Sequence, residues 1–145
     1  MESTQRSNGN PKVTRLARSL LHTCCYGGLF LFALPVLAQT PAGYTDEQAA
    51  QGETQYEEQC AECHGYNLEG FGFVPSLSGN FFSRRWGDKA VTELATSLQR
   101  MPPTQPGGLG EQTYSQILAF LLQRNGVEAG TTSLPVALAD LEGLT

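Results

Sequence analysis

The pentapeptide Cys60-Ala61-Glu62-Cys63-His64 decides how the rest of this chain is interpreted. Two thiols at this spacing can each add across a vinyl group of one haem, and the imidazole of the next residue then lies under the ring with a nitrogen directed at the iron. The motif therefore predicts one haem c attached through Cys60 and Cys63, with His64 as an axial ligand.

Other interpretations of the motif are a structural disulfide, a redox-active dithiol and half of a zinc site. A thioredoxin-like dithiol is expected between a strand and a helix of a βαβ unit, and no such pattern surrounds residues 60–64. A structural zinc site needs four ligands, and the residues after position 38 supply two cysteines and one histidine. These observations favour haem attachment.

Residues 1–38 have the order of a secretory signal peptide. Residues 1–18 are polar and basic, residues 20–37 are mostly apolar, and Val36-Leu37-Ala38 offers a cleavage site. We expect cleavage after Ala38, export to the periplasm and no stable membrane span afterwards. The alternative is an uncleaved anchor that leaves the protein on the membrane, facing the periplasm.

The residues after position 38 retain the set that a His/Met-ligated haem requires. Cys60 and Cys63 are their only thiols, His64 is their only imidazole and Met101 is their only thioether. A second histidine ligand is therefore impossible within this part of the chain, and Met101 is the candidate for the other axial position. The alternative for Met101 is a filler of the hydrophobic core.

The charge of the same part of the chain is strongly negative. Four of the 9 basic residues lie before position 39, but only one of the 14 acidic residues does, so residues 39–145 carry a net charge of −8. We therefore expect no nucleic acid partner. Only Lys89 remains as a lysine, so we expect a protein partner to meet uncharged residues near the haem edge, or the acidic side chains.

Three segments have helical periodicity and none has a convincing strand pattern, which predicts an all-α fold. The predicted helices are 45–63, 88–99 and 112–124, and two loops rich in glycine and proline, 67–79 and 101–110, are expected to wrap the haem.

The first predicted helix carries a glycine in its interior. Gly52, Tyr56 and Cys60 recur at every fourth position and share one face. Because such a glycine costs about 1 kcal/mol, it indicates close approach of another helix, with Phe120 packed on Gly52 and Tyr56. Simple tolerance of the glycine is the alternative.

Over nearly all of residues 45–126 the chain resembles a class I c-type cytochrome with a single haem. The resemblance implies an all-α cytochrome c fold, with three to five helices wrapped around one covalently attached haem. The residues that carry it are Gly52, Tyr56, the motif at 60–64, Pro75-Ser76-Leu77-Ser78-Gly79, Trp86, Met101-Pro102, Ala119-Phe120-Leu121 and Asn125-Gly126.

The resemblance also implies roles for residues outside the motif. The carbonyl of Pro75 would accept the free ring N–H of His64, which orients a haem ligand. Trp86 would reach a haem propionate through its indole N–H, and Met101 would be the distal iron ligand. Arg84 and Arg85 are candidates for neutralising the propionates, and surface salt bridges are the alternative for both.

These features predict an electron-transfer protein, not an enzyme, because an iron with two protein ligands is saturated. The alternatives are a gas or redox sensor with a labile Met101, and a haem peroxidase, which would need acid–base residues beside an open iron. The domain prediction is a signal peptide at 1–38, a linker at 39–44, the cytochrome domain at 45–126 and a tail at 127–145 that packs on it.

The tail resembles that of cytochromes which accept electrons from periplasmic quinoprotein alcohol dehydrogenases. We therefore expect a periplasmic dehydrogenase as electron donor and an oxidase or another cytochrome of a respiratory chain as acceptor.

Overall fold

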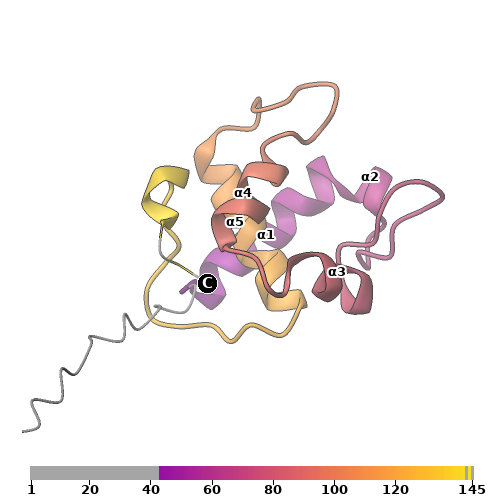
Figure 1. Ribbon diagram of the computed structural model, residues 1–145. Coiled ribbons are helices and arrows are strands. Elements are labelled where there is room, and N and C mark those ends of the chain that lie inside the picture. Colours follow the sequence, from indigo (N-terminus) through magenta and orange to yellow (C-terminus); the bar gives the residue numbers. More distant parts are fainter. Residues whose placement is uncertain (1–42, 143, 145) are drawn as a thin grey trace, which may run out of the picture. The chain divides into compact units, whose positions relative to one another are not determined.

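The computed structural model describes residues 43–142 and Leu144, which form a helical domain (Figure 1). The elements are α1 (Asp46–Gln59), α2 (Ala61–His64), α3 (Gly79–Trp86), α4 (Val91–Leu98), α5 (Glu111–Arg124) and the 3-10 helix η1 (Leu138–Leu141). The described residues contain no strand; Phe71 and Val74 form an isolated antiparallel bridge, and Leu144 is the other described residue in a bridge. The predicted all-α fold with three to five α-helices is confirmed. The signal peptide predicted at 1–38 lies outside the described residues.

Helix α1 begins where the sequence predicts, because Thr45 caps it. The Thr45 hydroxyl accepts a 3.2 Å hydrogen bond from the backbone N–H of Gln48, and two acidic residues in the first turn favour the positive end of the helix dipole. The prediction of one continuous helix over 45–63 is wrong. Cys60 has φ −127° and ψ −34°, outside the regular helical geometry, so the chain turns there and starts α2.

Helices α1 and α5 pack against each other at Gly52. A Cβ atom at this position would lie 1.9 Å from the backbone carbonyl oxygen of Gln116, so only glycine permits the contact. The rings of Tyr56 and Phe120 lie next to it, with centroids 5.3 Å apart. The predicted close approach is confirmed, and simple tolerance of the glycine does not explain the position.

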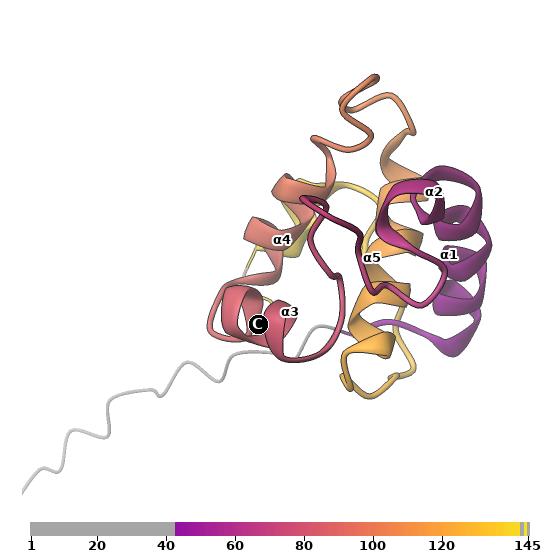
Figure 2. The same ribbon diagram turned by 90° about the vertical axis from the view of Figure 1, so that its right-hand side faces the viewer.

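Helix α3 was not predicted, because it is only eight residues long and directly follows a loop rich in glycine and proline. Helix α4 lies within the predicted segment 88–99. Helix α5 starts one residue before the predicted segment 112–124 and ends at Asn125-Gly126, where Gly126 takes a φ of +85° that favours glycine. Figure 2 shows the loop after α2 running from the α1–α2 side of the domain to α3.

The segment after α5 contacts α1 and α5 through buried side chains and hydrogen bonds. Leu134 and Leu141 are almost fully buried. The Gln48 amide oxygen accepts from the backbone N–H of Leu134 at 2.8 Å, and its amide nitrogen donates to the Leu134 carbonyl at 3.1 Å. None of the helices within residues 43–142 is long and apolar enough to cross a membrane.

Candidate functional site

A mainly apolar cavity of about 240 Å³ lies between the helices and is lined by residues from α1 to α5 and from both predicted loops. Leu94 and Leu98 of α4 and Ile117 and Leu121 of α5 form much of its apolar wall. The predicted site residues on this cavity are Cys60, Cys63, His64, Pro75, Arg85, Trp86 and Met101.

Both thiols of the motif are free and face this cavity. Cys60 lies at the break between α1 and α2 and is half-buried, while Cys63 lies on α2 and is exposed. Burial, together with the neighbouring Cys63, raises the pKa of the Cys60 thiol to about 11. Redox-active and metal-binding thiols need the opposite shift, so the arrangement does not suit a catalytic dithiol.

His64 is held with one ring nitrogen engaged and the other free. Its Nδ1 lies 3.0 Å from the carbonyl oxygen of Pro75. Because a carbonyl can only accept a hydrogen bond, Nδ1 carries the proton and Nε2 keeps its lone pair. This is the pairing that the family resemblance implies, and it leaves Nε2 able to ligate a metal ion.

Hydrogen bonds connect both ends of the loop that carries Pro75 to neighbouring helices. The Tyr56 hydroxyl donates to the carbonyl of Gly65 at 2.6 Å, and burial raises the pKa of Tyr56 well above its usual value, so the hydroxyl stays a donor. At the other end of the loop, the Asn125 amide donates to the carbonyl of Leu77 at 2.9 Å and accepts from the N–H of Gly79 at 3.1 Å. Asn125 is among the residues that carry the family resemblance, but nothing in the sequence near it indicates these bonds.

Met101 follows α4 and is held by α5. Its backbone N–H donates to the carbonyl of Leu98 at 2.9 Å, and its carbonyl accepts a 2.7 Å hydrogen bond from the Tyr114 hydroxyl. Met101 is half-buried and lines the cavity. Tyr114 lies in the helix predicted over 112–124, and no local pattern in the sequence indicates its bond to Met101.

The two arginines of α3 have different positions. Arg85 lines the cavity, and its guanidinium lies 5.1 Å from the ring centroid of Trp86, which also lines it. Arg84 is exposed and does not line the cavity. Among the described residues the one ion pair joins Lys89 and Glu93, so neither arginine forms the salt bridge considered as an alternative.

The donor set of the cavity fits a haem c. Two free thiols, the Nε2 lone pair of His64 and an apolar enclosure are what covalent attachment and axial ligation need. In the part of the chain that the structure describes, no group of three or more His, Cys, Asp or Glu side chains could hold a metal ion by itself.

Comparisons with known proteins agree with this geometry. A family model described as cytochrome c oxidase, cbb3-type, subunit III matches residues 47–121, which include every residue that lines the cavity. Cytochrome c-554(547) of Halothiobacillus neapolitanus is 30% identical over 84 residues, which cover 50% of this chain and 92% of that protein. The search of solved structures found no match.

Proposed function

This chain belongs to the cytochrome c family, and from that premise we propose that it carries single electrons on one haem c attached through Cys60 and Cys63. The observation that carries the proposal is the gathering of both thiols, the free Nε2 of His64 and Met101 on one apolar cavity. Bound there, the haem supplies an iron that alternates between its ferrous and ferric states.

The chain's own residues position the two proposed iron ligands, His64 and Met101. The Pro75 carbonyl fixes the tautomer and orientation of His64 through the 3.0 Å hydrogen bond from Nδ1 and makes the ring a stronger donor. Tyr114 holds the backbone of Met101. A histidine–methionine ligand pair raises the reduction potential compared with two nitrogen ligands, which suits a carrier in an oxidising pathway.

The walls of the cavity supply the rest of the site. Leu94, Leu98, Ile117 and Leu121 exclude water and lower the local dielectric, which tunes the potential of a bound metal centre. We assign propionate binding to Trp86 and Arg85 and not to Arg84, because only the first two line the cavity.

We further propose a periplasmic location, reached through a signal peptide at 1–38 that precedes a short linker, the cytochrome domain at 45–126 and the tail at 127–145. The donor in this proposal is a periplasmic dehydrogenase of the quinoprotein alcohol dehydrogenase type, which the resemblance of the tail supports. The acceptor is an oxidase or another cytochrome, in keeping with a family model described as an oxidase subunit.

The test of the central proposal is the absorption spectrum of the exported protein before and after acid–acetone extraction. We expect the haem bands to stay with the polypeptide, and the double variant Cys60→Ala/Cys63→Ala to lose its haem to the solvent or to fail to accumulate. Covalent haem in Cys60→Ala/Cys63→Ala would show that the assignment is wrong.

A further inference from the structure

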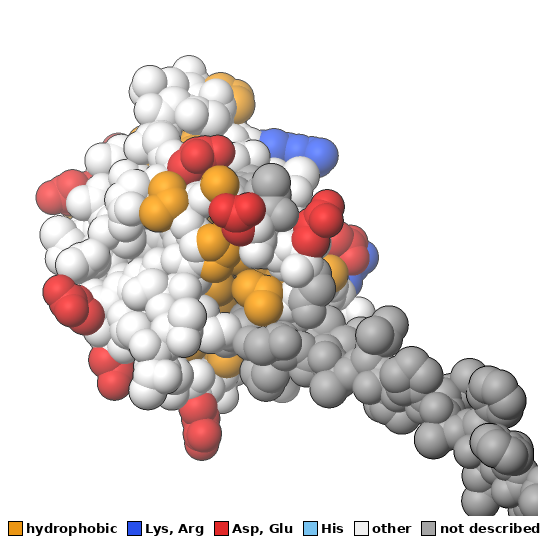
Figure 3. Space-filling model, turned by 90° about the vertical axis from the view of Figure 1, so that its left-hand side faces the viewer, with side chains coloured by type: hydrophobic (Ala, Val, Ile, Leu, Met, Phe, Trp, Pro, Cys, Tyr) orange, Lys and Arg blue, Asp and Glu red, His pale blue; other side chains and the backbone are white. Residues whose placement is uncertain are grey.

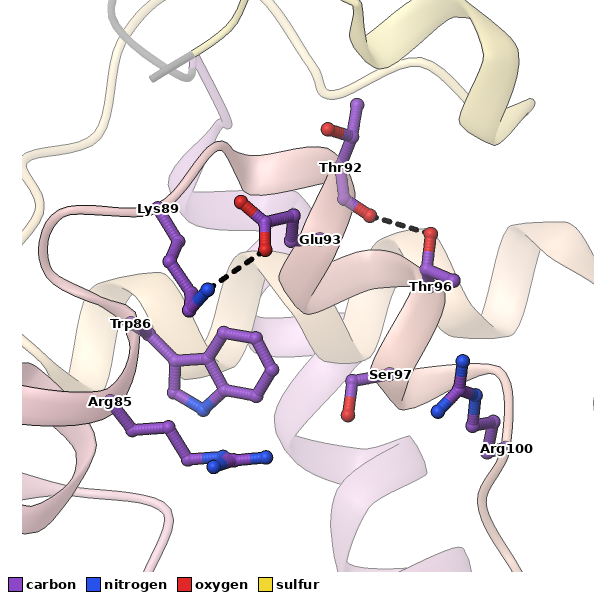
Figure 4. Close-up of a pocket in the computed structure, with 8 residues that line it drawn as sticks. All are labelled: Arg85, Trp86, Lys89, Thr92, Glu93, Thr96, Ser97 and Arg100. Carbon is purple, nitrogen blue, oxygen red and sulfur yellow. Dashed lines mark hydrogen bonds and ion pairs between the residues drawn. The ribbon is translucent and has the colours of Figure 1, made fainter.

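A second hollow of about 470 Å³ lies beside the cofactor cavity, between α3 and α4. Figure 4 shows the side chains around it, which come from the end of α3, from the turn after it, from α4 and from the turn after α4. We call it the basic groove and define it by Arg85, Trp86, Lys89, Glu93, Ser97 and Arg100, with two threonines of α4 between them.

The basic groove concentrates positive charge on a strongly acidic chain. Residues 39–145 contain five basic residues, and three of these, Arg85, Lys89 and Arg100, line the groove. By contrast, the face drawn in Figure 3 carries acidic side chains spread around a central hydrophobic group, with basic side chains only near one edge.

The positive charge of the groove is only partly neutralised within the described residues. Lys89 pairs with Glu93 at 2.9 Å, and both side chains are about half exposed, at 45% and 53%. Arg85 stacks on the indole of Trp86, and neither Arg85 nor Arg100 has an acidic partner among residues 43–142. Because like charges around one hollow repel each other, Arg85, Lys89 and Arg100 together favour binding of an anionic group there.

The groove lies next to the cofactor cavity and shares part of its wall. Arg85, Trp86 and Ser97 line both, so a molecule seated in the groove is separated from the cavity by the indole of Trp86 and its neighbours. Lys89, Glu93 and Arg100 line the groove alone. Their charges therefore are not accounted for by the binding of a cofactor within the cavity.

We propose that the basic groove is the docking site for an acidic redox partner protein, whose surface carboxylates bind Lys89 and Arg100. The proposal rests on the proposed electron-carrier function: one electron passes between the haem of this chain and the partner's redox centre, one being oxidised as the other is reduced, with no bond formed or broken. Contacts of this kind are small, below about 1,200 Å², and depend on charge steering. This proposal differs from the expectation drawn from the sequence, in which the partner meets uncharged residues near the haem edge or the acidic side chains.

The first test measures binding without electron transfer. Hexacyanochromate(III), a redox-inert paramagnetic trianion, is titrated into isotope-labelled mature holoprotein and the broadening of amide signals is mapped by NMR. We expect the strongest broadening at Thr92, Thr96 and the indole N–H of Trp86, and little on α1. A hexaglutamate peptide should displace the probe at a lower concentration than free glutamate or inorganic phosphate. Uniform broadening, or equal displacement by the small anions, would overturn docking of an acidic protein.

The second test follows oxidation of the reduced protein by hexacyanoferrate(III), which takes one electron and becomes hexacyanoferrate(II). The net charge of −8 predicts a rate that rises with ionic strength, because screening relieves repulsion, whereas the groove predicts a rate that falls. We expect Arg100→Glu to slow the reaction at low salt by roughly three- to tenfold. Glu93→Gln, which releases Lys89, should accelerate it.

Arg84→Glu is the matched control, because it makes the same charge change on α3 at an exposed position outside the groove. Equal slowing by Arg84→Glu and Arg100→Glu, or a rate that rises with salt, would contradict the docking site. If the protein still holds covalent haem and takes up one electron reversibly, these outcomes contradict only the docking site and not the proposed function. Loss of those two properties in the unmodified protein would instead contradict the proposed function itself.

Discussion

The hydroxyl of Tyr114 donates a 2.7 Å hydrogen bond to the backbone carbonyl of Met101. This bond connects the backbone of the proposed distal ligand to α5. Tyr114 is 2% exposed and lies in the first turn of that helix. Because α5 also packs on α1 at Gly52, the position of Met101 depends on the contact between the two long helices and not on its own loop alone.

Replacing Tyr114 by Phe should loosen the distal ligand. The lost hydrogen bond costs about 1 kcal/mol, which corresponds to roughly a fivefold change in an equilibrium constant. We therefore expect imidazole to bind the ferric protein about fivefold more tightly in Tyr114→Phe, measured by absorption titration. Tyr44→Phe is the control, since the Tyr44 hydroxyl donates to the carbonyl of Val127 and Tyr44 does not line the cavity. Unchanged imidazole affinity in Tyr114→Phe would mean that this bond does not hold the ligand.

Replacing Met101 by Ala should leave one coordination position of the iron free for an added ligand. We expect the reduced Met101→Ala protein to bind carbon monoxide and its reduction potential to fall, whereas the unmodified protein should bind no carbon monoxide. Leu98→Ala is the control, because Leu98 lines the same cavity but offers no ligand. It should lower stability by about 2–5 kcal/mol, as large-to-small changes in a core do, without opening the iron. Carbon monoxide binding by the unmodified protein would favour the sensor over the carrier.

Replacing Gly52 by Ala should destabilise the domain, although alanine is the better helix former. The new Cβ would meet the Gln116 carbonyl at 1.9 Å, and backbone atoms cannot move aside as a side chain can. Overpacking of this kind costs about 1–3 kcal/mol, which exceeds the gain in helix propensity of about 1 kcal/mol. Denaturant unfolding followed by circular dichroism measures the difference.

The control for this prediction is Ala50→Gly on the exposed side of the same helix. It changes helix propensity in the opposite direction and should cost about 1 kcal/mol without any clash. A Gly52→Ala protein more stable than the unmodified one would show that α1 and α5 do not approach as closely as described.

Replacing Asn125 by Ala should free the loop that carries Pro75. The variant loses the hydrogen bonds to Leu77, Leu121 and Gly79, of which the first two are part-buried and the last is exposed; each such bond contributes about 0.5–1.5 kcal/mol. We expect faster hydrogen exchange at the amide of Gly79 and lower stability to denaturant. Gln123→Ala removes an exposed amide that bonds Asp46 and should change stability by no more than about 0.5 kcal/mol. Similar effects of the two variants would contradict the role of Asn125.

The haem motif, the all-α class and the approximate helices over 88–99 and 112–124 were all predictable from the sequence, because each depends on residues close together in the chain. The 60–64 motif is a local chemical pattern, and helical periodicity is a local property of the backbone. The Gly52–Phe120 contact was also predicted, since a glycine on an otherwise well-formed helix face indicates close packing.

Tertiary structure alone decided the break at Cys60, the existence of α3, the separation of Arg85 from Arg84, and the hydrogen bonds of Tyr114 and Asn125. The partners of Asn125 at Gly79 and Leu77 lie 46 and 48 positions away in the chain, so no local pattern indicates them. The basic groove has the same origin: Arg85 lies near the end of α3, Lys89 in the turn after it, and Arg100 in the turn after α4. Their charges combine only because packing brings these elements around one hollow, where Coulomb energy depends on distance in space and not on separation along the chain.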